Sequence, residues 1–175
     1  MFVNLVYPFT ATYLDYPDDE SLAITILFCG CNHFCKNCHN QELQNYNYQK
    51  GTKVFYIDQF INELKNVALK YKTSKIVLQG GDPLFKTNID FTRRFLEKVS
   101  NYFDVCLYTG YSLEDIKKND IKGYTFLKTG TYNENLKQDS EKTDDYIQFA
   151  STNQRLYDSD NTLISDNGKY YFKRG

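Results

Sequence analysis

Four of the five cysteines of this 175-residue chain lie within ten residues of one another, and this crowding constrains the fold more than any other feature of the sequence. They are Cys29, Cys31, Cys35 and Cys38, whereas Cys106 stands alone in an apolar segment. The disulfides of small secreted proteins join distant segments, so their cysteines are spread along the chain. Crowded thiols indicate metal or redox chemistry in a reducing compartment. We therefore expect a cytoplasmic protein with a thiol-based site.

The segments around the cysteines alternate between strand-like and helix-like spacing of hydrophobic residues. This alternation predicts a mostly parallel sheet with helices outside it. A closed eight-fold barrel takes about 250 residues, so we expect an α/β fold that forms only a partial (β/α) barrel. The predicted strands lie at 22–28, 76–78, 105–108, 124–127 and 147–149. Two helices are predicted at 57–71 and 91–99, and Asp90 is expected to cap the second of them. A third, shorter helix is predicted to begin at the capping box of residues 112–115.

The chain is expected to form one domain over residues 1–175. Asn167-Gly168 between Ile164 and Tyr170 predicts a hairpin-like C-terminal extension at about 160–175. Residues 136–145 are polar and are expected to form a surface loop. The formal charge is only −1, which argues against a nucleic-acid or anionic-membrane partner. No apolar run is long enough to span a bilayer.

Cys31, Cys35 and Cys38 form the pattern C-x3-C-x2-C directly after the first of these strands. Soft thiolates favour zinc or an iron–sulfur cluster. A structural zinc ion takes four ligands, which Cys29, His33 or His39 could complete locally. A cubane cluster ordinarily takes four cysteines, so three would leave one iron open to another molecule. A redox pair of Cys35 and Cys38 would leave Cys31 unexplained.

Four segments, in order along the chain, resemble one known family. The cysteine loop at 31–40 and Gln79-Gly80-Gly81-Asp82-Pro83-Leu84 are similar to the cluster loop and the glycine-rich motif of the radical S-adenosylmethionine enzymes. The segments 107–111 and 151–156 are similar to those of the activating proteins of anaerobic ribonucleoside-triphosphate reductases. C-x3-C-x2-C alone is only moderately specific, whereas four ordered matches make a strong resemblance.

The resemblance implies a radical S-adenosylmethionine domain. It implies a [4Fe–4S] cluster whose fourth iron binds S-adenosyl-L-methionine, with no side chain acting as the catalyst. Reductive cleavage of that cofactor would generate a glycyl radical on the glycyl radical subunit of an anaerobic ribonucleoside-triphosphate reductase, with an electron donor such as flavodoxin. The residues that would hold the cluster are Cys31, Cys35 and Cys38, and those that would contact S-adenosylmethionine are Asn37, His39, Gly80, Gly81 and Asp82.

The chain also departs from the family pattern. A glycine-rich segment before the first strand is replaced by residues 16–20, and a later Asp-Gly by Thr129-Gly130. Cys29 stands where a hydroxyl residue is expected, and Asn37 where many members carry an aromatic residue. Two alternatives remain at this point. One is a zinc-stabilised module that binds another protein, and the other is a radical enzyme that acts on a different glycyl radical enzyme or on a small molecule.

Overall fold

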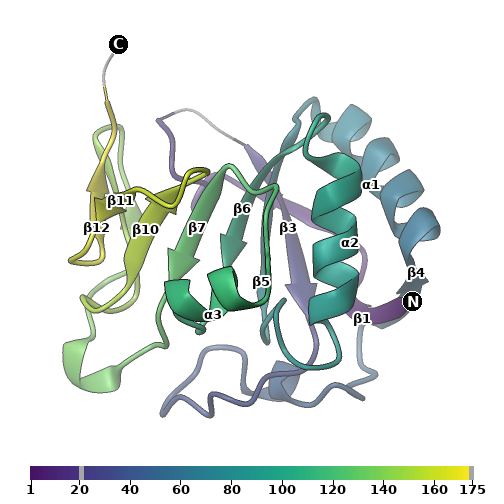
Figure 1. Ribbon diagram of the computed structural model, residues 1–175, viewed down its shortest axis with the longest axis horizontal. Helices are drawn as coiled ribbons and strands as arrows, with labels where there is room; N and C mark the ends of the chain where they lie inside the picture. Colours follow the sequence, from purple (N-terminus) through teal and green to yellow (C-terminus); the bar gives the residue numbers. More distant parts are fainter. Residues whose placement is uncertain (20–21, 174–175) are drawn as a thin grey trace.

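The computed structural model of the chain describes residues 1–19 and 22–173. Within them, nine strands form one mixed sheet, which Figure 1 shows with helices packed in front of it. Eight of these strands follow the order β11-β10-β7-β6-β5-β3-β1-β4, and β2 pairs with β3. The strands are β1 (Phe2–Val6), β2 (Thr10–Thr12), β3 (Ala23–Phe28), β4 (Thr52–Tyr56), β5 (Lys75–Gly80), β6 (Asp104–Tyr108), β7 (Phe126–Thr129), β10 (Arg155–Asp158) and β11 (Leu163–Ser165).

The centre of the sheet is parallel. Strands β3, β5, β6 and β7 pair in this order, with Ile26 opposite Leu78 and Val77 opposite Cys106. The outer strands β1 and β4 on one side, and β10 and β11 on the other, run antiparallel to their neighbours. The prediction of an α/β protein with a mostly parallel sheet is therefore confirmed, and the antiparallel edges were not foreseen.

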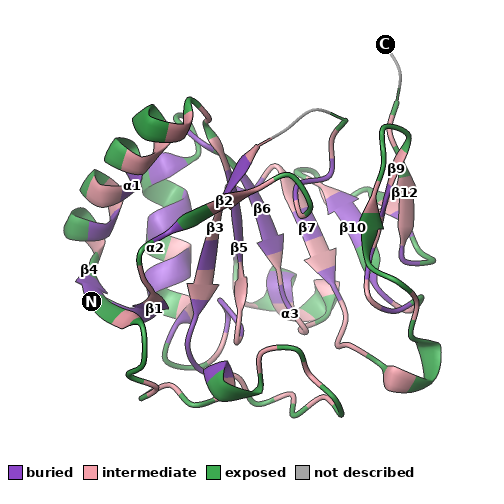
Figure 2. Ribbon diagram, turned by 180° about the vertical axis from the view of Figure 1, so that it is seen from behind, coloured by how far each residue is buried: buried purple, intermediate pink, exposed green. Residues whose placement is uncertain are grey.

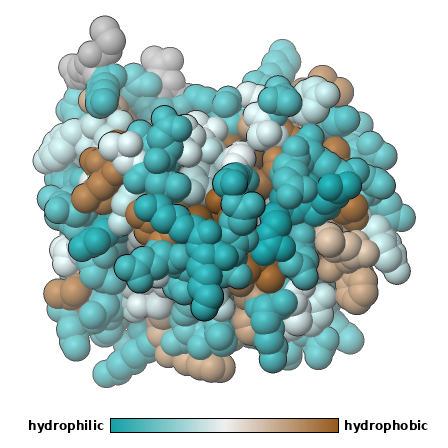
Figure 3. Space-filling view, in the orientation of Figure 1, coloured by the Kyte–Doolittle hydropathy of each residue, from teal (hydrophilic) through white to brown (hydrophobic). Residues whose placement is uncertain are grey.

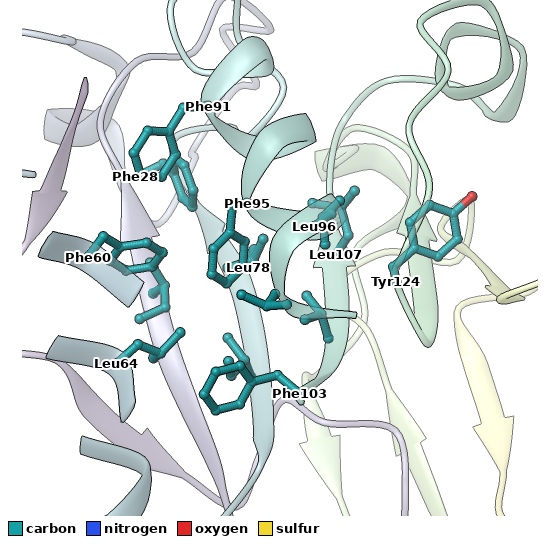
Figure 4. Close-up of a cluster of buried hydrophobic side chains, with 14 of the residues drawn as sticks. Phe28, Phe60, Leu64, Leu78, Phe91, Phe95, Leu96, Phe103, Leu107 and Tyr124 are labelled. Atoms are coloured by element: carbon teal, nitrogen blue, oxygen red, sulfur yellow. The ribbon is translucent and has the colours of Figure 1, made fainter. Parts of the chain in front are cut away.

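Helices α1 (Ile57–Tyr71) and α2 (Ile89–Val99) cover one face of the parallel strands. Their apolar sides carry Phe60 and Phe95, whose ring centroids are 5.0 Å apart, and meet Leu78 and Leu107 from the sheet (Figure 4). Figure 2 shows the same division along each helix, with a buried inner side and an exposed outer side. This is the arrangement expected of amphipathic helices on a buried sheet.

The ends of the helices partly match the sequence predictions. Helix α3 (Leu113–Lys118) begins with the predicted capping box, in which Ser112 and Asp115 exchange side-chain and backbone hydrogen bonds. Helix α2 has its N-cap position at Asn88, so the prediction that Asp90 caps this helix is wrong. Asp90 lies in the first turn and pairs with Arg93.

The opposite face of the sheet carries Val77, Cys106 and Phe126, because successive side chains of a strand point to opposite faces. Tyr16, from the segment before β3, covers them and lies 5.7 Å from the Phe126 ring in an edge-on contact. Cys106, which stands in an apolar segment of the sequence, is completely buried here. Tyr16 belongs to segment 16–20, which departs from the family pattern; Glu20 of this segment lies outside the described residues.

Four predictions for the C-terminal half need correction. Strand β7 lies two residues later than predicted, at Phe126–Thr129, and β9 covers Tyr146–Gln148. The stretch 136–145 contains the end of the 3-10 turn η2 (Glu134–Leu136) and strand β8 (Glu141–Lys142), so it is not only a loop. Strands form on both sides of the turn at Gly168, but β11 pairs with β10, and β12 (Lys169–Tyr171) pairs with β9 in a separate sheet of β8, β9 and β12.

The surface that carries α2 and α3 is predominantly hydrophilic, with hydrophobic residues scattered through it (Figure 3). None of the helices formed by residues 1–19 and 22–173 has the length and apolar character needed to cross a membrane.

Candidate functional site

Loops that follow β3, β5, β6 and β7 meet at one edge of the sheet, at the carboxyl ends of the parallel strands, which is where α/β sheets build their sites. Together they line an open cavity of about 190 Å³. The segment after β3 runs along the lower side of this edge in Figure 1. The lining includes three cysteines of that segment, Gly80 to Asp82 after β5, Thr109 and Gly110 after β6, and Gly130 to Tyr132 after β7.

Cys31, Cys35 and Cys38 are free, half-buried thiols, and all three line the cavity. The loop that carries them turns sharply, since Phe34 and Asn37 adopt left-handed backbone conformations with φ of 50° and 58°. Few residues other than glycine adopt this conformation, and it is common at functional sites. Burial raises the pKa of the Cys31 thiol to about 11 and also raises that of Cys35. Metal binding to these thiols therefore releases protons.

The donor set suits an iron–sulfur cluster. Three soft thiols from one loop reach the same cavity, and thiolates are the usual ligands of such clusters. Considering only the described residues, no three side chains of His, Cys, Asp or Glu converge as they would around a single metal ion. A four-iron cluster takes each thiolate on a different iron and so occupies a larger space. Cys29, which could have completed a zinc site, is completely buried.

His33, a candidate fourth zinc ligand in the sequence, is engaged elsewhere. Its side chain is only 15% exposed, and its Nε2 lies 2.8 Å from Oδ2 of Asp82. The backbone N–H of His33 also points to Sγ of Cys31 at 3.5 Å. The imidazole therefore belongs to the wall of the site, where it connects the cysteine loop to the loop after β5.

Asp82 lies at the centre of the site and is 1% exposed. Besides His33, its carboxylate accepts hydrogen bonds from the backbone N–H groups of Leu84 at 2.8 Å and Gly110 at 2.9 Å, and from the Thr109 hydroxyl at 2.9 Å. These donors come from the loops after β3, β5 and β6. The family resemblance implies that Asp82 contacts the cofactor. In the structure the Asp82 carboxylate joins three loops by hydrogen bonds.

Gly80 and Gly81 both line the cavity, but the structure also requires them for packing. A Cβ on Gly80 would lie 2.6 Å from the backbone nitrogen of Phe28, and Gly80 has φ of +109°. A Cβ on Gly81 would lie 2.6 Å from the carbonyl oxygens of both Gly30 and Leu43. These separations are too short for real Cβ atoms, so the two glycines let the loop after β5 lie against the chain that leads into the cysteines.

The two remaining predicted contacts differ in position. His39 is exposed and lines the cavity, with its ring 5.9 Å from the ring of Tyr132. Asn37 is exposed and is not part of the lining that the described residues form. A hydrogen bond from Tyr132, and after it one from Asn37, lowers the pKa of the Glu134 carboxyl. Of the predicted site residues, the structure therefore brings seven to the cavity: Cys31, Cys35, Cys38, His39, Gly80, Gly81 and Asp82.

Sequence reasoning gave no role to Asn88, Tyr108 or Lys128, although Tyr108 lies in the segment 107–111 that resembles the family. Asn88 is completely buried, and its side-chain amide donates to the carbonyl oxygens of Cys29 and Asp82, both at 2.9 Å. Tyr108 and Lys128 stand side by side on β6 and β7, with Nζ of Lys128 4.5 Å from the Tyr108 ring centroid. Strand alternation is the one signal that could have placed them, since Tyr108 and Lys128 follow Cys106 and Phe126 by two residues and share their face.

Lys128 also borders a second cavity of about 280 Å³, which adjoins the first. The residues that line both cavities are His39, Gln79, Tyr108, Lys128 and Ala150. Gln79 donates to Asp15 at 2.9 Å on the far side. Burial lowers the pKa of the Lys128 ammonium to about 8. Burial also raises the pKa of the Asp15 carboxyl. A desolvated cation and a desolvated carboxyl therefore lie next to the cysteine cavity.

Comparison with known proteins adds a family to this geometry. The family of 4Fe-4S single cluster domains matches residues 20–157. An anaerobic ribonucleoside-triphosphate reductase-activating protein of Haemophilus influenzae is 32% identical over 114 residues, which are 59% of this chain and 70% of the relative. The protein of the same name from Enterobacteria phage T4 is 28% identical over 147 residues, or 82% of this chain and 88% of the relative.

A further relative is matched over a shorter part of its length. A putative glycyl-radical enzyme activating enzyme of Methanocaldococcus jannaschii is 29% identical over 93 residues, which are 53% of this chain and 33% of the relative. The matched residues 20–157 contain the cysteine loop, the glycine-rich loop and the strand ends that build the cavity.

Proposed function

This chain belongs to the family of 4Fe-4S single cluster domains and to the anaerobic ribonucleoside-triphosphate reductase-activating proteins, and we propose that it generates a glycyl radical on such a reductase. The observation that carries the proposal is the convergence of Cys31, Cys35 and Cys38 on one cavity with the Gly80 to Asp82 loop. The proposal includes a single domain over residues 1–175, whose open sheet is a partial barrel of the radical S-adenosylmethionine type.

In this proposal Cys31, Cys35 and Cys38 would hold a [4Fe–4S] cluster, and the same cavity would take S-adenosylmethionine. Reduced by a donor such as flavodoxin, this pair would supply the radical chemistry that removes a hydrogen atom from a glycine of the target.

The chain itself binds, orients and shields these groups. Cys31, Cys35 and Cys38 lose their protons on binding iron. Gly80 and Gly81 keep the wall of the cavity free of side chains, and His39 lies at its edge. Asn37 does not line the cavity, so a contact with the adenosyl part of S-adenosylmethionine would need the turn at Asn37 to lie against the bound cofactor. The Asp82 carboxylate keeps the loops after β3, β5 and β6 in register.

Anaerobic reconstitution with iron and sulfide tests the cofactor part of the proposal. We expect about four irons and four sulfides per chain, the stoichiometry of one cubane cluster. Addition of S-adenosylmethionine and a reductant should release methionine and 5′-deoxyadenosine. Cys35→Ser should lose both the cluster and this release. Cys106→Ala is the matched control, because Cys106 is a buried core thiol of β6 and should leave the iron content unchanged.

Binding of one zinc ion without any cluster under these conditions would contradict the proposal and favour a zinc-stabilised module that binds another protein. The two proteins differ in colour, since an iron–sulfur protein is brown and a zinc protein is colourless.

The identity of the target is tested separately. Incubation of the loaded protein with an anaerobic ribonucleoside-triphosphate reductase, S-adenosylmethionine and reductant should produce the EPR doublet of a glycyl radical on the reductase. A protein that cleaves S-adenosylmethionine but gives no doublet would act on a different glycyl radical enzyme or on a small molecule, and the cofactor assignment would stand.

A further inference from the structure

The contact between His33 and Asp82 joins the cysteine loop to the rest of the site. His33 lies between Cys31 and Cys35 in the sequence, and Asp82 follows the two glycines after β5. Because a carboxylate can only accept hydrogen bonds, Nε2 of His33 carries the hydrogen in this 2.8 Å contact. The imidazole therefore reaches from the loop that bears the thiols to the end of the neighbouring parallel strand.

The acceptor capacity of Asp82 is already used by the chain. A carboxylate offers about four lone-pair sites. Four donor groups point at them, namely the imidazole of His33, the hydroxyl of Thr109 and the backbone N–H groups of Leu84 and Gly110. A ligand ammonium at this carboxylate would have to displace one of these donors. The geometry therefore fits a carboxylate that holds parts of the chain together better than one that is available to a ligand.

The imidazole is held on its other sides as well. A Cβ on Gly110 would lie 2.5 Å from a ring carbon of His33, so only glycine allows the ring to lie where it does. The ring of Tyr111 packs edge-on against the imidazole at a centroid distance of 4.6 Å. The Tyr111 hydroxyl lies 3.0 Å from the side-chain oxygen of Asn32, which precedes His33. Gly110 and Tyr111 of the loop after β6 thus contact the cysteine loop at His33 and at Asn32, in addition to the hydrogen bond between His33 and Asp82.

We propose that His33 is a positioning residue, which holds Cys31 and Cys35 at the cavity by donating a hydrogen bond to Asp82. This inference rests on the proposed function, because it concerns how firmly the cysteine loop holds its cluster. A residue that orients a metal-binding loop without touching the metal typically changes metal affinity by about 10- to 100-fold when it is lost. The main part of this effect depends on the length of the side chain and on its N–H donor, and the ring contacts support them.

Two substitutions test whether the side chain at position 33 must be long enough to place an N–H donor at Asp82. The amide of His33→Gln places an N–H donor about as far from the backbone as Nε2 of histidine. The side chain of His33→Asn carries the same amide but is one methylene shorter, so it cannot reach Asp82. Phe34→Ala is the matched control, because Phe34 lies in the same loop and is 72% exposed.

The readout is the rate at which the reconstituted proteins lose iron to a chelator under anaerobic conditions, together with the EPR spectrum of the reduced cluster. We expect His33→Asn to lose iron about 10- to 100-fold faster than wild type, with an altered EPR spectrum. His33→Gln should stay closer to wild type than to His33→Asn, and Phe34→Ala should match wild type. The Tm of the metal-free proteins checks that all variants are folded.

The possible failures are distinguishable. If His33→Asn keeps its iron as long as wild type, or if His33→Gln loses iron as fast as His33→Asn, the inference is overturned and the proposed function stands. If the wild-type chain itself takes up no cluster, both are overturned.

Discussion

At the residue scale, Lys128 is a positively charged side chain that has lost most of its contact with water. It projects from β7 between the two adjoining cavities, over the rings of Tyr108 and Phe149, whose centroids lie 4.5 and 5.6 Å from Nζ. The aromatic faces attract the cation, but they do not replace the water that it loses. Burial therefore lowers the pKa of Lys128 to about 8. The folded protein holds this proton less tightly than the unfolded chain does.

Substitution Lys128→Met should raise the free energy of unfolding at pH 7, because the variant no longer buries an ammonium. This advantage should shrink as the pH rises from about 8 to about 10. In that window wild-type Lys128 is deprotonated when folded, whereas an unfolded lysine keeps its proton up to roughly pH 10.4, so wild-type stability increases with pH. With partial exposure discounted, the change is on the order of 2 kcal/mol, since one unit of pKa corresponds to about 1.4 kcal/mol.

The measurement is urea unfolding of the metal-free wild type and variant at pH values between 7 and 10. Lys122→Met is the control, because it removes a lysine whose side chain is 78% exposed. A difference between wild type and Lys128→Met that does not vary with pH would contradict this prediction.

The sequence located the residues of the site better than their contacts. Cys31, Cys35 and Cys38 are visible as a spacing, and Gly80 to Asp82 follow a predicted strand. The hydrogen bond from His33 to Asp82 joins residues 49 positions apart, and no local pattern encodes it. The same is true of Asn88, whose amide serves the carbonyl groups of Cys29 and Asp82.

At the scale of elements, the junction between β5 and the cysteine loop depends on a close approach of two backbones. The N–H groups of Gly81 and Asp82 donate to the carbonyl oxygens of Phe28 and Gly30 at 2.7 and 2.8 Å, and Gly30 in turn donates to Leu43 at 2.7 Å. Gly81 thus lies between two parts of the chain that follow β3. A side chain at this position has no space.

Substitution Gly81→Ala should therefore destabilise the protein by about 1–3 kcal/mol, the usual cost of overpacking. The expected result is a lower urea midpoint for unfolding of the metal-free protein. Gly51→Asn serves as the control. Gly51 has φ of +66° with nothing within 4 Å of an added Cβ, and asparagine tolerates this left-handed conformation. An unchanged midpoint for Gly81→Ala would show that the loop yields at little cost.

Elements with strong local signals were predicted well. The hydrophobic spacing of α1 and the capping box of α3 give the observed helices at Ile57–Tyr71 and Leu113–Lys118. Strand β4 was missed because it lies at the edge of the sheet and buries only Phe55, so its pattern does not alternate clearly. The start of α2 was misplaced because Asn88 occupies the cap position without capping, its side chain being committed to the site.

At the scale of the whole molecule, the small sheet of β8, β9 and β12 is connected to the segment before β3 by one buried lysine. The Lys142 side chain is 6% exposed, and its Nζ donates to the carbonyl oxygen of Tyr16 at 2.8 Å and lies 3.8 Å from Oδ1 of Asp18. Burial lowers the pKa of Lys142. This contact joins residues 126 positions apart and closes one side of the sheet.

Substitution Lys142→Met should loosen the small sheet without unfolding the parallel core. Loss of one hydrogen bond, worth about 0.5–1.5 kcal/mol, should speed amide hydrogen exchange in β8, β9 and β12 by roughly 2- to 10-fold. Exchange in β5 and β6 should remain unchanged, and the exposed Lys137→Met should behave as wild type. Equal acceleration in β5 and β6 would mean that the two sheets open as one unit.

The parallel centre of the molecule could be predicted because strand and helix signals alternate along the chain. The antiparallel strands at the edges could not, since the pairing of β1 with β4 or of β10 with β7 joins segments far apart in the sequence. The hairpin predicted at Asn167-Gly168 failed for the same reason. The local turn formed, but the partners of β11 and β12 are set by the rest of the fold.

The hydrogen bonds that converge on Asp82 come entirely from the polypeptide. If the chain holds the proposed cluster, its loss on exposure to oxygen would therefore leave these bonds between the loops intact, and added iron and sulfide would restore the centre without a new polypeptide.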